Sequence, residues 1–113
     1  MKLLIAIIQP DKLDEVHEAL VAAGITRITA SRASGQGRAQ EMELYRGTEV
    51  AASRMPKVRL EIALNDEFVQ PCIDAIVRAA RHGEGERGDG KIFVLPLERV
   101  VRISTGEEDR QGI

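Results

Sequence analysis

The sequence predicts an α+β fold in which two β-α-β halves are joined by a long loop. Three patterns support this prediction: apolar runs with strand spacing, two segments whose apolar residues recur at helical spacing, and an aperiodic stretch between the halves. Two such halves within 113 residues describe the ferredoxin-like βαββαβ sandwich, in which both helices lie on one face of a four-stranded antiparallel sheet.

Length and composition indicate a single domain, residues 1–113, with an aliphatic core, because 43% of the residues are apolar but only 3% are aromatic. A net charge of −2 argues against nucleic acid or an anionic membrane as the partner. Cys72 is the single cysteine and excludes an internal disulfide. The apolar run Leu3–Ile8 is too short for a signal or a membrane span, so we expect a cytoplasmic protein.

The first half begins with a strand that leads into an amphipathic helix. The continuous apolar run Leu3–Ile8 predicts a strand covered on both faces. Pro10 ends this strand, Asp11 is the expected helix N-cap, and Gly24 is the residue that closes the helix. The loose alternation of residues 25–34 then predicts a second strand.

The second half follows the aperiodic stretch Gly35–Arg54, whose length favours a functional loop over a simple connection. The alternation in Val58–Leu64 predicts the clearest strand of the chain. Asn65 or Asp66 is expected to cap the second helix. This helix must start late or kink, because Pro71 removes an interior hydrogen bond.

The segment after the second helix is predicted to return to the sheet. Lys91–Leu97 has the pattern of a fourth strand, and Arg99–Ile103 that of a short fifth strand. Ser104–Ile113 is expected to form an acidic, polar tail.

The most informative stretch is Gly83–Lys91, which contains four glycines. Glycine allows positive φ and close approach, so several backbone amides of this loop can point at one anion, and Lys91 adds a positive charge. An exposed turn is the alternative. The spacing from Gly85 to Gly90 approaches a P-loop, but Ile92 stands where Ser or Thr would bind Mg²⁺. The loop also runs from a helix into a strand rather than into a helix.

Other chemistries find little support in the sequence. His17 and His82, with one cysteine, have no zinc-ligand spacing, and we expect no metal site. Cys72 falls on an apolar helical stripe and is interpreted as a buried small hydrophobe. Phe93 is the one aromatic in a predicted strand, which does not favour RNA binding by the sheet. No catalytic constellation emerges, so we expect a protein that is not an enzyme.

Several anion-binding elements remain, each of which would be an ordinary solvated group on its own. They are Gly35–Arg38, Lys57, Gly88–Lys91 and Arg102. All are expected at loops that border the sheet, and sheet edges need covering. A polyphosphate held between associated subunits would use every one of them.

Three motifs in this order resemble the PII signal-transduction proteins. They are Leu44–Glu49 (LYRGxE) together with Pro56–Val58 (PKV), then Gly88–Val94 (GDGKIFV), then Val101–Glu108 (VRIxTGEE). The resemblance covers nearly the whole chain. It implies a homotrimer of ferredoxin-like subunits with ATP or ADP in the clefts between neighbours.

The resemblance also divides the domain into functional loops and implies a role. The T-loop would span about 36–54, the B-loop about 82–91 and the C-terminal loop about 102–113. Members of the family change the shape of the T-loop with the ligand and dock it on a transporter, an enzyme or a transcription regulator. The implied function is therefore signal transduction in nitrogen regulation, without catalysis.

The resemblance assigns contacts to individual residues. Nucleotide would be bound by Ile7, Thr29, Gly35, Gly37, Arg38, Gly88, Asp89, Gly90, Lys91, Phe93 and Arg102. Lys57 matches the lysine that meets 2-oxoglutarate. The glutamine that helps to hold Mg²⁺ and 2-oxoglutarate is replaced by Ala39, and Gln40 is the candidate substitute.

Three further departures from the family pattern change the expected ligand. Val50 replaces the tyrosine that many members have uridylylated, so no modification is expected there. The B-loop is two residues longer and carries Glu84 and Glu86, and Ser104 replaces a second phosphate arginine. We therefore expect ADP or AMP to bind at least as well as ATP, with or without Mg²⁺, and 2-oxoglutarate to bind weakly or not at all. The alternatives are a regulator of carbon uptake or metal efflux, or a small enzyme acting on phosphoryl substrates.

Overall fold

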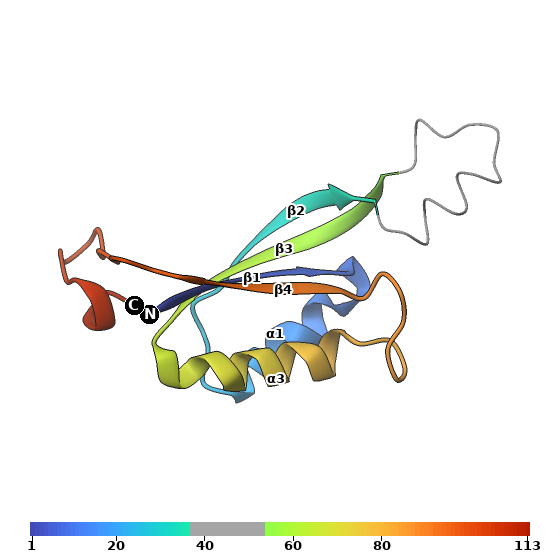
Figure 1. The fold of residues 1–113 in the computed structure, drawn as a ribbon, viewed down its shortest axis with the longest axis horizontal. Helices are drawn as coiled ribbons and strands as arrows, with labels where there is room; N and C mark the ends of the chain where they lie inside the picture. Colours follow the sequence, from blue (N-terminus) through green and yellow to red (C-terminus); the bar gives the residue numbers. More distant parts are fainter. Residues whose placement is uncertain (37–53) are drawn as a thin grey trace.

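The computed structural model describes residues 1–36 and 54–113. Their elements in chain order are β1 (Lys2–Ile8), η1 (Pro10–Lys12), α1 (Leu13–Ala22), β2 (Thr29–Gly35), β3 (Met55–Leu64), η2 (Asp66–Phe68), α3 (Val69–Ala80), β4 (Gly90–Pro96) and η3 (Asp109–Gln111). The sheet order is β2-β3-β1-β4, and every neighbouring pair is antiparallel. Both helices cover one face of this sheet (Figure 1). The predicted ferredoxin-like α+β fold is confirmed.

The core lies between the helices and one face of the sheet. Because side chains alternate along a strand, every second residue of β1 and β3 points toward the helices. Fully buried members of this layer include Leu4, Ile8, Leu60, Ile62, Val16, Leu20, Cys72 and Ile76. The core is aliphatic, as the composition predicts.

The opposite face of the sheet is open, and here the sequence-based expectation for β1 was wrong. Leu3, Ile5 and Ile7 alternate with the buried residues of β1 and remain partly exposed, because the two described helices, α1 and α3, lie on the other side. A continuous apolar run predicts two covered faces, but within the described residues of one chain only one face is covered.

Both helices begin with a turn of 3₁₀-helix instead of the expected side-chain caps. Asp11 lies within η1 and Asp66 within η2, and neither helix has a capping hydrogen bond from a side chain. Pro71 is the third residue of α3, where a backbone N–H has no intrahelical partner, so the later start costs no hydrogen bond. Gly24 follows α1 with φ of +82°, as its predicted role requires.

The C-terminal segment differs from its prediction. Arg99–Ile103 does not form a fifth strand, because no strand within residues 1–36 and 54–113 lies beside it to pair; Val101 makes a single bridge to Glu108 instead. The polar segment that follows is folded back on the domain, where Arg110 pairs with Glu67. Among the described residues, no helix has the length and apolar character needed to cross a membrane.

Candidate functional site

The glycine-rich segment 82–91 connects the end of α3 to the edge strand β4 (Figure 1). It therefore receives the C-terminus of a helix, and its geometry is not that of a P-loop. Its four glycines all have positive φ. Gly90 has the tightest surroundings, since a Cβ there would lie 1.7 Å from the main-chain oxygen of Ile7.

The carboxylate of Asp89 holds the loop in shape from inside. It accepts hydrogen bonds from the backbone N–H of Glu86 at 2.7 Å and of His82 at 3.3 Å, and its Oδ1 lies 2.6 Å from His82 Nδ1. Partial burial raises the pKa of Asp89, but the hydrogen bonds from Glu86 and His82 outweigh it and leave the pKa below its usual value. Asp89 is thus a loop-organising residue: its carboxylate accepts hydrogen bonds from within the loop, and its backbone N–H donates to the main-chain oxygen of Glu86 at 3.2 Å.

The loop is fastened to the root of the 36–54 segment through the carbonyl of Gly88. Gln9 donates to this oxygen from Nε2 at 2.6 Å, and Lys57 Nζ approaches it at 3.5 Å. Lys57 is only 9% exposed, and Gly35 lies against its side-chain stem. The structure therefore brings Gly35, Lys57 and Gly88 together, as one site would require.

Other predicted contact residues share the open face of the sheet. In the β1–β4 pairing, Ile7 is opposite Lys91 and Ile5 is opposite Phe93. Thr29 belongs to the same cross-strand row as Ile5 and Phe93, because both Thr29 and Ile5 pair with Glu61 of β3. Thr29 and Phe93 nevertheless lie on the two edge strands, roughly 14 Å apart at about 4.8 Å per strand. One chain alone does not bring them into contact.

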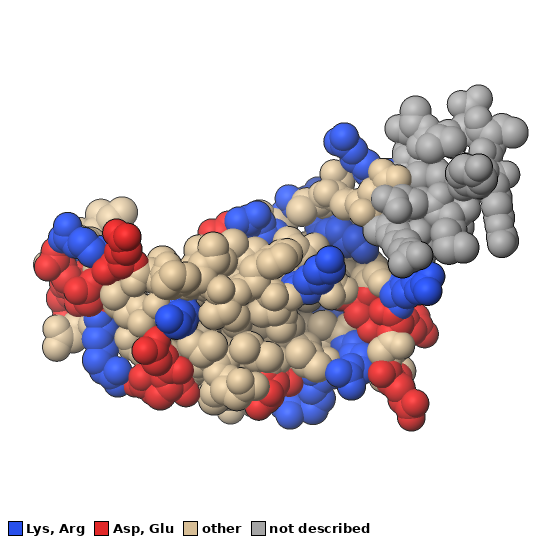
Figure 2. All heavy atoms as spheres, in the orientation of Figure 1, with Lys and Arg blue, Asp and Glu red and all other residues tan. Residues whose placement is uncertain are grey.

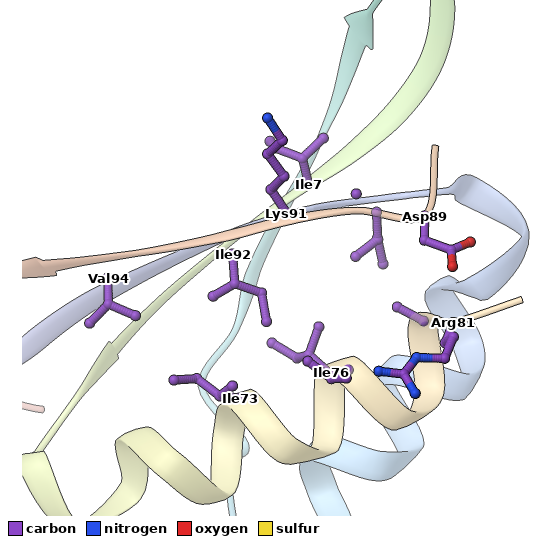
Figure 3. A pocket seen from close by; sticks show the side chains of 12 residues that line it. Ile7, Ile73, Ile76, Arg81, Asp89, Lys91, Ile92 and Val94 are labelled. Carbon is purple, nitrogen blue, oxygen red and sulfur yellow. The ribbon is translucent and has the colours of Figure 1, made fainter. Parts of the chain in front are cut away.

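A pocket of about 410 Å³ lies between β4 and α3, on the face of the sheet that the helices cover. Figure 3 shows Ile92 and Val94 pointing toward Ile73 and Ile76, whereas the Lys91 side chain points away from them. The lining is mainly aliphatic, with charged groups gathered at the end nearest the glycine-rich loop.

The segment that follows β4 and contains Arg102 lies at the opposite end of the molecule from the glycine-rich loop (Figure 1). The seven residues of β4 separate the two regions by roughly 20 Å at about 3.3 Å per residue. The Arg102 guanidinium donates to the main-chain oxygens of Gly112 at 3.4 Å and Ile113 at 2.9 Å. The structure of one chain does not place Arg102 beside the other candidate residues.

Several predicted residues lie outside the described part of the chain: Gly37, Arg38, Ala39, Gln40 and Val50. Sequence reasoning missed the contributions of Gln9, Asp11 and His82 to the loop. No spacing rule could find them, since Gln9 and Gly88 are 79 residues apart and meet only because β1 pairs with β4. Across the described ranges, no three His, Cys, Asp or Glu side chains are grouped to hold a metal ion.

The fold and this loop define a small ferredoxin-like α+β protein whose candidate site is built from loop backbone and lysine side chains. A profile of the family described as nitrogen regulatory protein P-II matches residues 1–107. The chain is 49% identical to the nitrogen regulatory protein P-II of Klebsiella oxytoca and to P-II 1 of Escherichia coli K12, and 47% identical to P-II of Rhizobium etli. Each alignment covers all of both chains.

The chain therefore belongs to the nitrogen regulatory protein P-II family. The resemblance drawn from its motifs is confirmed at the level of the family. The matched relatives are named as regulatory proteins and not as enzymes, which agrees with the expectation of a regulator without catalysis.

Proposed function

We propose that this protein is a cytoplasmic signal-transduction regulator that binds an adenine nucleotide and controls a partner protein in nitrogen regulation through residues 36–54. The observation that carries the proposal is the contact between Lys57 and the Gly88 carbonyl. It joins the glycine-rich loop to the root of the segment that would meet the partner, so a ligand that moves one is mechanically coupled to the other.

The loop supplies suitable chemistry for a phosphate group. Gly88 and Gly90 leave their backbone amides unobstructed by a Cβ, and Lys91 is exposed at the end of the loop. Lys57 adds a second positive charge within the same region. Backbone amides combined with lysine ammonium groups are a common means of holding phosphate oxygens.

A neighbouring copy of the chain would complete the site. The segment after β4 that contains Arg102 is remote from the glycine-rich loop of its own chain, so Arg102 would reach phosphates held at that loop from another subunit. The exposed apolar side chains Phe93, Val94 and Leu95 of β4 also need covering. Figure 2 shows a broad uncharged area over β4 and α3, with charged side chains gathered toward the ends. The trimer implied by the family accounts for both features.

The ligand preference follows from the charges near the loop. Glu84 and Glu86 are exposed on the loop, and Ser104 offers no charge to a terminal phosphate. ADP or AMP should therefore bind at least as well as ATP. 2-Oxoglutarate should bind weakly or not at all, because residue 39 is Ala where the family pattern has the glutamine that helps to hold it.

Subunit mixing tests the proposal. Lys91→Ala and Arg102→Ala should each abolish tight ADP binding when measured by calorimetry on the purified variant. Co-refolded mixtures should recover part of it, because a site between one subunit with Lys91 intact and a neighbour with Arg102 intact contains both groups. Absence of ADP binding by the wild type would refute the proposed function, and absence of recovery in the mixture would refute a site shared between subunits. Full binding by either single variant would remove that residue from the site.

The partner is expected to be a protein, either a membrane transporter or a soluble regulator. Deleting residues 40–52 should spare oligomer formation and ADP binding but abolish capture of the partner. Regulation of carbon uptake or metal efflux is the second candidate, supported by the acidic loop and by Val50 in place of the modified tyrosine. Identifying the protein that co-purifies with this chain would distinguish nitrogen regulation from regulation of carbon uptake or metal efflux.

A further inference from the structure

We propose that His82 and Asp11 form a protonation-dependent clamp that positions the glycine-rich loop, so that nucleotide binds more tightly when His82 is protonated. The inference rests on the proposed nucleotide site. It concerns residues 11 and 82, which are not among the residues assigned to ligand contact.

The two contacts of the His82 ring favour its doubly protonated form. Its Nδ1 lies 2.6 Å from Asp89 Oδ1, and its Nε2 lies 2.9 Å from Asp11 Oδ2. A neutral imidazole carries one N–H and could donate to only one of these carboxylates, leaving its other nitrogen and a carboxylate oxygen as two facing acceptors. Only the imidazolium can donate to both.

The charges around the ring favour the same state. The hollow that contains His82 is also lined by Asp11, Glu86, Arg87 and Asp89. The hydrogen bond with Asp11 and then that with Asp89 raise the pKa of His82, against the opposing effect of burial.

Two further charged groups lie close to this hollow. Arg81 precedes His82 in the chain, but its side-chain stem lies near Gly85. Lys12 of η1 adjoins Asp11 and pairs with Glu15 at 3.5 Å. The carboxylates that contact the ring are therefore its closest charged partners.

The clamp reaches the candidate site through Asp89. This residue stands between Gly88 and Gly90, and the same carboxylate that contacts the ring also accepts the backbone N–H of Glu86. Loss of the His82 proton removes one donor from this arrangement and leaves Asp11 and Asp89 without their shared cation. The loop is then less firmly held in the shape that presents its amides.

The direction of the pH effect follows from linkage. A histidine whose pKa is raised in the folded protein contributes its full stabilisation below the ordinary value of about 6.5 and loses it as the pH rises through the raised value. Because the clamp holds the loop in its nucleotide-binding shape, bound ADP should further favour the protonated ring and raise the pKa of His82 above its value in the unliganded protein. Affinity for ADP should then be highest in mildly acidic solution and decrease as the pH rises above the His82 pKa of the unliganded protein.

The test combines histidine NMR titration of the unliganded protein with ADP calorimetry between pH 5.5 and 8.5. Asp11→Asn is the main variant, because it alters the outer, exposed carboxylate and leaves Asp89 and the loop intact. His82→Gln removes the titrating group, and its binding profile corrects for titration of the nucleotide phosphates themselves.

We expect the midpoint of His82 to lie above the ordinary histidine value of about 6.5 and to fall in Asp11→Asn. The wild-type decrease in ADP affinity should exceed that of His82→Gln by roughly three- to tenfold. The inflection of the ADP-affinity profile should move with the His82 midpoint in Asp11→Asn. A His82 midpoint at or below about 6.5, or an inflection shared by all three proteins, overturns the clamp.

Failure of the clamp can be distinguished from failure of the proposed function. If ADP binds at every pH with no dependence on His82, the nucleotide function stands and the clamp is refuted. If ADP binds at no pH, the nucleotide function is refuted and the inferred control of affinity falls with it. In that case, coupled titration of the Glu86 amide and the His82 ring would still show that the ring holds the loop.

Discussion

The main-chain oxygen of Ile7 and the α-carbon of Gly90 are so close that a Cβ at residue 90 would lie 1.7 Å from that oxygen. Gly90 also has φ of +116°, a conformation that side chains rarely adopt. The obstacle is backbone of the central strand β1, which cannot move aside without breaking the sheet. We expect Gly90→Ala to lower the free energy of unfolding by about 3 kcal/mol or more, as measured by urea denaturation.

Gly83 provides the matched control for this substitution. It also has positive φ, +57°, but no atom lies within 4 Å of a Cβ built there. Gly83→Ala should therefore lower the free energy of unfolding by only about 1 kcal/mol, which is the cost of holding a residue with a side chain at positive φ. Equal losses in the two variants would show that backbone conformation, and not the contact with Ile7, makes glycine necessary at residue 90.

Cys72 should be chemically inert in the folded protein. Its side chain is fully buried, and desolvation raises the pKa of the thiol to about 11, so very little reactive thiolate exists at neutral pH. Labelling with a chromogenic disulfide reagent should be slow in buffer and become rapid in denaturing urea. Rapid stoichiometric labelling of the native protein would contradict the observed burial.

Phe93 is expected to contribute to subunit association. It is 48% exposed on the edge strand β4, within an apolar surface that a neighbouring subunit would cover. Phe93→Glu should lower the molar mass measured by light scattering toward that of one chain, because a charge buried at an interface is costly. Val21→Glu is the control: Val21 is similarly exposed, at 46%, but lies on α1, and its substitution should leave the mass unchanged.

Ser104 should limit the affinity for ATP. It is exposed in the turn that follows Arg102 and stands where the family resemblance expects a second phosphate arginine. A charge-assisted hydrogen bond contributes about 1.5–3 kcal/mol. Ser104→Arg should therefore raise ATP affinity by roughly tenfold or more relative to AMP, as measured by competition binding. Parallel gains for both nucleotides would mean that the new side chain does not reach the terminal phosphate.

Much of the architecture could be predicted from local patterns. Alternation in Val58–Leu64 and the apolar stripe of α3 indicated their elements, because burial on one face imposes a period of two on a strand and 3.6 on a helix. The glycines of the glycine-rich loop, and the fact that this loop runs from a helix into a strand, could also be predicted, since both depend on the order of residues along the chain alone. These features sufficed to predict the sandwich and to reject a P-loop.

Contacts between distant residues could not be predicted in this way. Asp11 has the residue type and position of an N-cap, yet its carboxylate reaches His82, 71 residues away, because the helix begins with a 3₁₀ turn. Arg99–Ile103 has strand composition, but the sheet ends at β4 and offers it no partner. In both cases the local preference was overridden by what the rest of the fold placed nearby.

By itself, then, the sequence determined the order of the elements, the aliphatic core, the glycine-rich loop and the motifs that mark the family. Only the tertiary structure decided that Gly88 meets Gln9 and Lys57, that Asp89 faces inward to hold its own loop, and that the segment containing Arg102 lies at the opposite end of the molecule from that loop. The physical reason is that periodicity records which side of an element is buried. The pairing of β1 with β4 determines which distant side chains then come within hydrogen-bond distance.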